Sequence, residues 1–460
     1  MKDAPPLESM WRYGGLRLCV PGTLVGVLVA LAGATAYPQQ LIEPQGPGKA
    51  PRPVANLVRA PIDSLRREPL RHPGPLLEQA PSGPVGYCDH GPYGLAPTTQ
   101  IFAYGFNTLF AHGWNGAGIT IGIYEDAILS PADFHHFEVA CGLHNSLRIE
   151  TIGTPPPRGG DVLEATADAE IVAEFAPDAS IVVYPSANWL DAWEAMVHSN
   201  LADILLTSWG YCEATAVRYG ISSADYALFR LANEEGQTVV AAAGDQASTA
   251  CRTEDIAYPS VQEPAADPLT LAVGGTTLLS THPLREAAWS DGFEGGGGGL
   301  SMVWPRPSWQ AGPGVIEPGL SNGHREVPDV SASANPEVDP YWIYCNEPAC
   351  QTSSSFGWAL VGGTSTSAPL WAGLLADAEE AVGHRLGLIN PLLYQLAAGR
   401  EPPFDFVIQG SNSTPTDPGH YPAGPGYNMA AGLGGPLAYR LVEEMLQLPK
   451  DHAPNMASRS

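Results

Sequence analysis

The sequence predicts an α/β domain in which helices cover a mostly parallel sheet. From about residue 87 to residue 448, short apolar segments typical of buried strands alternate with amphipathic segments typical of helices. Charged residues make up only 15% of the 460 residues, and glycine and proline are abundant, which suits a globule with many turns rather than a coiled coil. In such sheets, chemical groups collect at the carboxyl ends of the strands.

Individual elements can be placed from their apolar runs and their boundaries. One helix stops before a proline, and another lies between a serine cap and a glycine stop. Apolar runs rich in valine and isoleucine read as buried strands. In chain order, the expected strands are 119–124, 180–184, 203–209 and 238–244, and the expected helices are 161–176 and 223–236.

A further helix is expected after the sequence VGGTSTSAP. Pro369 suits a first helical turn, and Ser367 is predicted to cap a helix that runs to Gly383. Ser365 would then lie just before the helix, where free N–H groups and the helix dipole favour a developing negative charge. Ser365 is therefore a candidate nucleophile, and the alternative is a structural cap without chemistry.

Charge and the terminal segments indicate where the protein works. The formal net charge of −26 argues against a nucleic-acid partner. Residues 1–36 carry a basic flank, an apolar run and a small-residue ending, and are predicted to be a signal peptide, with an uncleaved anchor as the alternative. We therefore expect a secreted, monomeric protein without stable membrane association. Residues 37–86 are expected to form a Pro-rich linker or short pro-segment, and residues 449–460 a flexible tail.

Six cysteines follow the predicted signal peptide. An even number in an exported chain suggests disulfides, and the spacings do not resemble a zinc site. The closest pair in sequence could close one loop, while the pairing of the other four is open. The arrangement expected here is Cys345–Cys350, Cys88–Cys141 and Cys212–Cys251.

A serine nucleophile needs a base, and histidine is the usual one. His90 and His112 are each followed by glycine, but both precede the first good strand and neither opens a helix. A histidine mechanism of the kind that uses Asp, His and Ser in chain order is therefore the weaker alternative.

Carboxyl groups are the other candidate bases. Glu164 and Asp168 are four residues apart, so a helix would place them on one face, where they could share a proton. The alternative is a solvated acidic face that also includes Glu170 and Glu174. Asp245 follows an apolar strand and could either cap a turn or stay protonated and donate to an oxyanion.

Together these residues resemble the sedolisins, the secreted serine-carboxyl peptidases. The family pattern has a Glu and an Asp four apart on a helix, a Gly-Asp after a strand and a Gly-Thr-Ser, matched here by Glu164, Asp168, Asp245 and Ser365. Segments such as TSWG, AVGGTTL and VPDVSASANP extend the likeness from about residue 88 to residue 436. The resemblance implies a subtilisin-like three-layer α/β/α fold with a mostly parallel central sheet of about seven strands over residues 87–448.

The resemblance also implies roles for these residues. Ser365 would attack the scissile carbonyl, and Glu164 would take its proton and return it to the leaving amine. Asp168 would orient Glu164 and share its proton. Asp245, neutral at low pH, would stabilise the oxyanion together with the backbone N–H of Ser365.

Two further residues belong to the implied site, Glu125 as an extension of the proton network and Trp209 as a lining residue. The expected function is acid-active hydrolysis of polypeptides, by internal cleavage. The alternative is a catalytically silent relative that binds peptides or has a structural role. The Pro-rich segment is also shorter than the folded prodomain that sedolisins carry, so either folding proceeds without one or activation differs.

The resemblance finally implies one calcium ion near the C-terminal end of the domain. The matching site has lost at least one carboxylate, because a phenylalanine stands where the first aspartate belongs and an asparagine where the second belongs. This loss disfavours calcium, although a register shift that uses Asp405 would restore a ligand. The implied positions are Phe406, Val407, Gly424, Gly426 and Asn428.

Overall fold

The computed structural model describes the chain in ranges 51–59, 98–157, 159, 161–254, 258–292, 294–315, 323–350, 357–413 and 421–448. The predicted signal peptide, Cys88, His90 and the predicted tail lie outside these residues. Among the described residues, none of the helices combines the length and apolar character that a membrane crossing requires.

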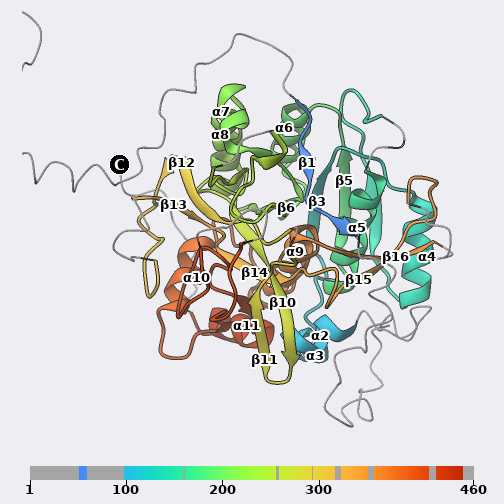
Figure 1. The fold of residues 1–460 in the computed structure, drawn as a ribbon. Helices are drawn as coiled ribbons and strands as arrows, with labels where there is room; N and C mark the ends of the chain where they lie inside the picture. Colours follow the sequence, from blue (N-terminus) through green and yellow to red (C-terminus); the bar gives the residue numbers. More distant parts are fainter. Residues whose placement is uncertain are drawn as a thin grey trace, which may run out of the picture. The chain divides into compact units, whose positions relative to one another are not determined.

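An eight-stranded sheet is the framework of the domain (Figure 1). Its order is β11-β10-β8-β6-β3-β5-β4, and β14 also pairs with β10. Every pairing is parallel except the β10–β11 hairpin, which confirms the predicted, mostly parallel sheet of about seven strands. The strands are β3 (Thr120–Glu125), β4 (Ser146–Ile149), β5 (Ser180–Pro185), β6 (Ile204–Thr207), β8 (Thr238–Ala242), β10 (Leu271–Thr281), β11 (Leu284–Ala288) and β14 (Val330–Ser333).

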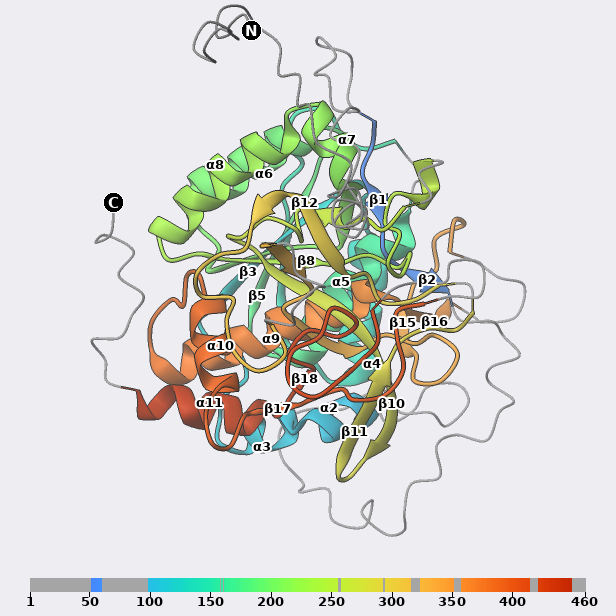
Figure 2. The same ribbon diagram turned by 60° about the vertical axis from the view of Figure 1, so that its left-hand side comes forward.

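Helices cover both faces of this sheet. Figure 2 shows α6 (Trp189–Ser199) and α8 (Ile221–Glu234) on one side, and α5 (Val162–Phe175) and α9 (Thr364–Val382) on the other. The other helices described are α2 (Thr98–Tyr104), α3 (Phe106–Ala111), α4 (Pro131–Cys141), α7 (Glu213–Arg218), α10 (Asn390–Ala397) and α11 (Ala438–Gln447). Strands outside the sheet include β12 (Gly299–Pro305), β13 (His324–Val327), β15 (Tyr341–Tyr344), β17 (Phe404–Asp405) and β18 (Gly435–Pro436).

Helices α5 and α9 are buried along almost their whole length and pack against each other. Their backbones come close because Gly373 faces Phe175: a Cβ on Gly373 would stand only 2.7 Å from the Cβ of Phe175. This close approach carries the carboxyl groups on α5 to the first turn of α9.

Some boundaries differ from the predicted ones. The segment predicted as one strand at 203–209 divides at Ser208 into β6 and β7 (Trp209–Cys212). Helix α8 begins at Ile221 after Gly220, so the predicted serine cap is wrong. The predicted cap at Ser367 is also wrong, because α9 begins at Thr364. The Ser367 hydroxyl donates instead to the carbonyls of Ala332 and Ser333, the last two residues of β14.

The disulfides agree with the expected pairing as far as the structure describes them. Cys212–Cys251 and Cys345–Cys350 are formed. Cys141 is disulfide-bonded as well, and its expected partner, Cys88, lies outside the described residues.

We expect Gly373→Ala to destabilise the protein, because the new methyl group overlaps Phe175 between two close helices. The loss should be about 1–3 kcal/mol, measured as a lower midpoint of urea unfolding. Ala381→Ser, at the half-buried end of α9, should change stability by less than about 0.5 kcal/mol. Equal stability of Gly373→Ala and the parent protein would show that this close approach is not a packing constraint.

Candidate active site

The predicted site residues converge at the carboxyl ends of the parallel strands. Glu125 is the last residue of β3, Asp245 follows β8, and Ser365 is the second residue of α9. Glu164 and Asp168 project from α5, which packs on α9. All five residues are buried.

A sharp turn places the hydroxyl of Ser365. Gly363 has φ 103°, a backbone conformation that favours glycine, and Asp245 Oδ1 accepts the N–H of Thr364 at 2.7 Å. Asp245 thus satisfies one of the free N–H groups at the start of α9, which begins earlier than predicted.

The hydroxyl of Ser365 lies beside the carboxyl group of Glu164. Burial raises the pKa of Glu164 well above its ordinary value, the charge of Asp168 adds to the rise, and the Ser365 hydroxyl opposes it by favouring the charged form. Ser365 Oγ and both carboxyl oxygens of Glu164 have no hydrogen-bond partner within the described ranges. Two adjacent unsatisfied groups of this kind can exchange a proton with each other when the carboxyl is ionised, or with a bound molecule.

The second half of the network surrounds Asp168, one helical turn after Glu164. Asp168 Oδ1 accepts the hydroxyl of Ser208 at 2.7 Å, and Glu125 Oε2 accepts the indole N–H of Trp209 at 2.7 Å. Burial raises the pKa of Asp168 to about 7, against hydrogen bonds from Ser208 and Glu125. Burial also raises the pKa of Glu125 well above its ordinary value, and the charges of Asp168 and Glu164 add to that rise.

Asp245 presents one free oxygen to the turn before α9. Its Oδ1 accepts the N–H and the hydroxyl of Thr364, at 2.7 and 2.9 Å, while Oδ2 has no partner among the residues described. Burial raises the pKa of Asp245 well above its ordinary value, although the Thr364 N–H opposes the rise. Asp245 is therefore neutral over a wide pH range and can donate a hydrogen bond from Oδ2.

The acidic residues of α5 do not form the solvated face considered as an alternative. Glu164, Asp168, Glu170 and Glu174 are all buried. The alternative is wrong because α9 and β15 cover this helix, and the N–H of Tyr344 donates to Glu170 Oε2 at 2.6 Å.

Histidine contributes no hydrogen bond to this cluster in the part of the chain that the structure describes. His112, one of the two histidines considered, closes α3 and stacks on Trp114 at 5.2 Å between ring centroids. It is exposed and precedes the first residue of β3, whereas Glu125 is the last residue of that strand.

An extended segment of the chain itself, residues 51–59, crosses the site. Strand β1 (Val54–Ala55) pairs antiparallel with β7, and β2 (Val58–Arg59) pairs antiparallel with β16 (Trp358–Gly362). Between the two strands, the carbonyl oxygen of Asn56 accepts the N–H of Ser365 at 3.0 Å. This pairing could not be predicted from the sequence, because a Pro-rich stretch carries no periodic signal and its pairing partners are more than 150 residues away.

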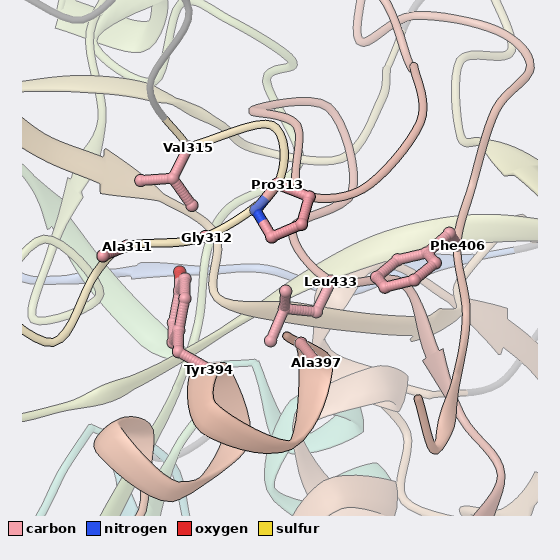
Figure 3. A pocket seen from close by; sticks show the side chains of 8 residues that line it. All are labelled: Ala311, Gly312, Pro313, Val315, Tyr394, Ala397, Phe406 and Leu433. Atoms are coloured by element: carbon pink, nitrogen blue, oxygen red, sulfur yellow. The ribbon is translucent and has the colours of Figure 1, made fainter. Parts of the chain in front are cut away.

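The calcium positions form a loop that already satisfies its own carbonyls. Asn428 Nδ2 donates to the carbonyls of Val407 at 3.1 Å and Gly424 at 3.2 Å, and its Oδ1 accepts two backbone N–H groups. Phe406 points into a small apolar pocket beside Leu433 (Figure 3). The donor set offers no carboxylate at these positions and therefore does not fit calcium.

Asp405, the proposed replacement ligand, is also engaged elsewhere. Its Oδ2 accepts the N–H of Glu286 at 3.1 Å, within the strands β11 and β17 that lie side by side. Gly426 sits against Pro313, whose carbonyl a Cβ on Gly426 would meet at 2.5 Å. Contacts within the protein therefore hold this loop together at the positions that were expected to bind the ion.

Comparison with known proteins agrees with this architecture. Residues 111–387 match the Subtilase family. Kumamolisin from Bacillus sp. (strain MN-32) is 32% identical over 424 residues, which cover 87% of this chain and 73% of kumamolisin. Sedolisin from Pseudomonas sp. (strain 101) is 31% identical over 262 residues, 54% of this chain and 40% of that protein.

A solved structure, Pseudomonas sedolisin complexed with two molecules of pseudo-iodotyrostatin, has a TM-score of 0.65 at 26% identity and covers 76% of this chain and 97% of that one. Fold and relatives together define a serine-type peptidase with a subtilisin-like fold. The chain belongs to the sedolisin family of serine-carboxyl peptidases.

Buried carboxyl groups are not confined to the site. Burial is the main cause that raises the pKa of many others, to about 7 for Glu213, Asp267 and Asp339 and to about 8 for Glu286 and Glu379. In the unfolded chain such groups titrate near 4, so between about pH 4 and pH 8 the folded protein keeps protons that the unfolded chain loses.

We therefore expect the melting temperature to be highest near pH 4 and to fall as the pH rises to 8. Each independent group shifted from about 4 to about 7 costs about 4 kcal/mol over this range, and coupled groups cost less. Differential scanning fluorimetry across this pH range is the measurement.

Glu174→Gln offers a direct check of the cause. Both carboxyl oxygens of Glu174 are buried without a hydrogen-bond partner among the described residues, and burial raises its pKa well above the ordinary value. Since glutamine does not titrate, this variant should flatten the loss of stability above pH 5, whereas Glu234→Gln on the exposed face of α8 should not. A melting temperature that rises from pH 4 to pH 8 would contradict the explanation.

Proposed function

We propose that the protein is a secreted, acid-active endopeptidase that cleaves polypeptides through an acyl-enzyme on Ser365. The observation that carries this proposal is the buried Ser365 hydroxyl beside the Glu164 carboxyl, with the neutral Asp245 at the same turn. The alternative of a catalytically silent relative is not favoured, because it gives no reason to bury these unsatisfied groups together.

In this mechanism Ser365 Oγ attacks the substrate carbonyl as its proton passes to the carboxylate form of Glu164, while Asp168 holds the proton that the two carboxyl groups share. Asp245 and the backbone N–H of Ser365 donate to the oxygen that becomes negative. Glu164 then gives the proton to the leaving amine, and water releases the acyl group by the reverse sequence. Asp168 acts as a positioning residue, since its charge adds to the rise in the pKa of Glu164 that burial causes, and Glu125 extends the network through its interaction with Asp168.

Acid conditions suit this arrangement. Asp245 can donate to an oxyanion only while it is protonated, and burial keeps it so at low and moderate pH. Because the pKa of Asp168 is about 7, the cluster gains a further negative charge as the pH rises through that value. Activity is therefore expected to fall as the pH rises through about 7.

Internal cleavage is supported by the extended segment in the site. Beyond Val54, which pairs with Gly210, the chain continues through Pro53, and Arg52 Nε lies 2.5 Å from Asp126 Oδ2. The cleft therefore accommodates more than three residues before the carbonyl that meets Ser365, which a tripeptide-trimming enzyme would not require.

Secretion is supported by the predicted signal peptide and by the disulfides Cys212–Cys251 and Cys345–Cys350, which persist in oxidising compartments. We further propose that the protein works without calcium, because an asparagine amide bridges the carbonyls where the ion was expected.

We expect Ser365→Ala and Glu164→Gln each to lower kcat for denatured casein at pH 4 by at least about 1,000-fold, since both belong to one proton-transfer unit. Asp245→Asn should retain more activity than Asp245→Ala, because its amide still donates to the oxyanion. Unchanged circular dichroism spectra would show that each variant folds.

Two results would contradict this mechanism. Activity that rises toward neutral pH and survives Glu164→Gln would indicate a histidine base. Correctly folded protein that does not cleave casein between pH 3 and 7 and behaves like Ser365→Ala would favour the silent relative.

The calcium proposal predicts that neither EDTA nor added CaCl₂ at about 5 mM shifts the melting temperature by more than about 1 °C. Asn428→Asp should lower the melting temperature, because the two carbonyls lose their donors, and added calcium should restore part of the loss. A clear drop in the melting temperature of the parent protein in EDTA would overturn this proposal.

A further inference from the structure

Residues 51–59 are extended and pair with β7 on one side and with β16 on the other, as a peptide substrate would; β2 lies beside β16 in Figure 2. On one side, Val54 pairs with Gly210 and Ala55 with Trp209; on the other, Val58 pairs with Gly362. The two residues between these ladders, Asn56 and Leu57, are therefore fixed at the catalytic turn from both directions.

The peptide bond between Asn56 and Leu57 is the one presented to the nucleophile. The Asn56 carbonyl oxygen accepts the Ser365 N–H at 3.0 Å. That oxygen and Asp245 Oδ2 each lie 2.4 Å from the point where a Cβ on Gly363 would stand, and the Leu57 Cα is 3.2 Å from it. The carbonyl thus occupies the space toward which the proposed oxyanion donors point.

The side chain of Asn56 enters a polar pocket that accepts its amide N–H groups, while its Oδ1 is buried without a hydrogen-bond partner among the described residues. Asn56 is fully buried, and its Nδ2 donates to the Ser208 carbonyl at 2.9 Å and to Gln262 Oε1 at 2.8 Å. Both amide protons are therefore used. A carboxylate in this place would face two acceptors, and an aliphatic side chain would leave them buried without a donor.

Gln262 is held in place from several sides. Its Nε2 donates to Gln246 Oε1 at 2.9 Å, so its Oε1 faces Asn56. Its side chain also lies against two glycines: a Cβ on Gly210 would come within 2.6 Å of Gln262 Oε1, and one on Gly244 within 2.8 Å of Cδ. The pocket is thus preorganised for a donor and has a fixed depth.

We propose that this pocket, formed by Gln262 and the Ser208 carbonyl, selects asparagine as the residue whose carbonyl is attacked, and that Asn56–Leu57 is the first bond the enzyme cuts. The proposal rests on the peptidase activity proposed above. It names the preferred residue of the substrate and identifies the chain's own segment as the molecule that fills the cleft before cleavage.

The step balances as ordinary hydrolysis. Ser365 Oγ bonds to the Asn56 carbonyl carbon while its proton passes to Glu164, and the carbon–nitrogen bond to Leu57 breaks as that nitrogen takes the proton. Water then attacks the acyl group and restores the Ser365 hydroxyl. The products are a chain that ends in the carboxylate of Asn56 and a chain that begins with the free amine of Leu57.

Self-cleavage is tested on the full chain, shifted from pH 7.5 to pH 4 and followed by intact mass and N-terminal sequencing. We expect a new N-terminus at Leu57, no such product from Ser365→Ala, and rates lowered at least about 100-fold by Asn56→Leu and Asn56→Asp. A product with another N-terminus, or equal rates for these variants, would overturn the choice of bond.

Selectivity is tested with peptides of sequence PVAXLVR, in which X is Asn, Gln, Asp, Leu or Phe. The acid-treated enzyme should show kcat/KM for Asn at least about 100-fold above the others. Gln262→Leu should bring the ratio of Asn to Leu close to one. The matched control is Gln237→Leu, a buried glutamine that bonds the Ala202 carbonyl on the sheet, and it should keep the selectivity.

The outcomes separate the two proposals. Serine-dependent casein hydrolysis without a preference for Asn overturns the pocket assignment and leaves the peptidase proposal standing. Loss of all serine-dependent hydrolysis in folded protein overturns both. Should Gln262→Leu not fold, Gln246→Leu, which frees the Gln262 amide to rotate, must reduce the ratio of Asn to Leu for the assignment to hold.

Discussion

The central constraint of this structure is that a cluster of carboxyl groups is buried beside Ser365 with no cation among the described residues paired to them. Glu125, Glu164 and Asp168 lie within one network, and desolvation is the largest cause of the raised pKa of each. Buried carboxylates without partners are so costly that such groups bind protons instead. The site is thus a store of exchangeable protons next to the hydroxyl of Ser365.

The fold places this cluster by bringing two buried helices into contact. Glu164 and Asp168 lie one turn apart on α5, and Gly373 lets α9 approach that helix closely. The turn at Gly363 then orients Ser365 toward Glu164 on one side and toward the cleft on the other. Asp245 bonds to Thr364 and so connects this turn to the segment that follows β8.

Features with a local signal could be predicted from the sequence, and features made by distant contacts could not. The apolar runs predicted the parallel strands, and the four-residue spacing of Glu164 and Asp168 predicted their common helix face. The start of α9 was misplaced, because its first N–H groups bind Asp245 and Asn56, both more than 100 residues away. Gln262 belongs to no sequence motif, and only its hydrogen bond with Asn56 in the structure identifies it as a pocket residue.

The same acid chemistry explains why an amide at Asn428 suits this protein better than a pair of carboxylates around an ion. Carboxylate ligands take up protons as the pH falls toward 4, so a calcium site loses its charge under the acid conditions proposed for this enzyme. The asparagine amide does not titrate, and it bridges the carbonyls of Val407 and Gly424 at any pH. A loop closed in this way contributes the same stability throughout the acid range, while the buried carboxyls make the rest of the fold more stable there.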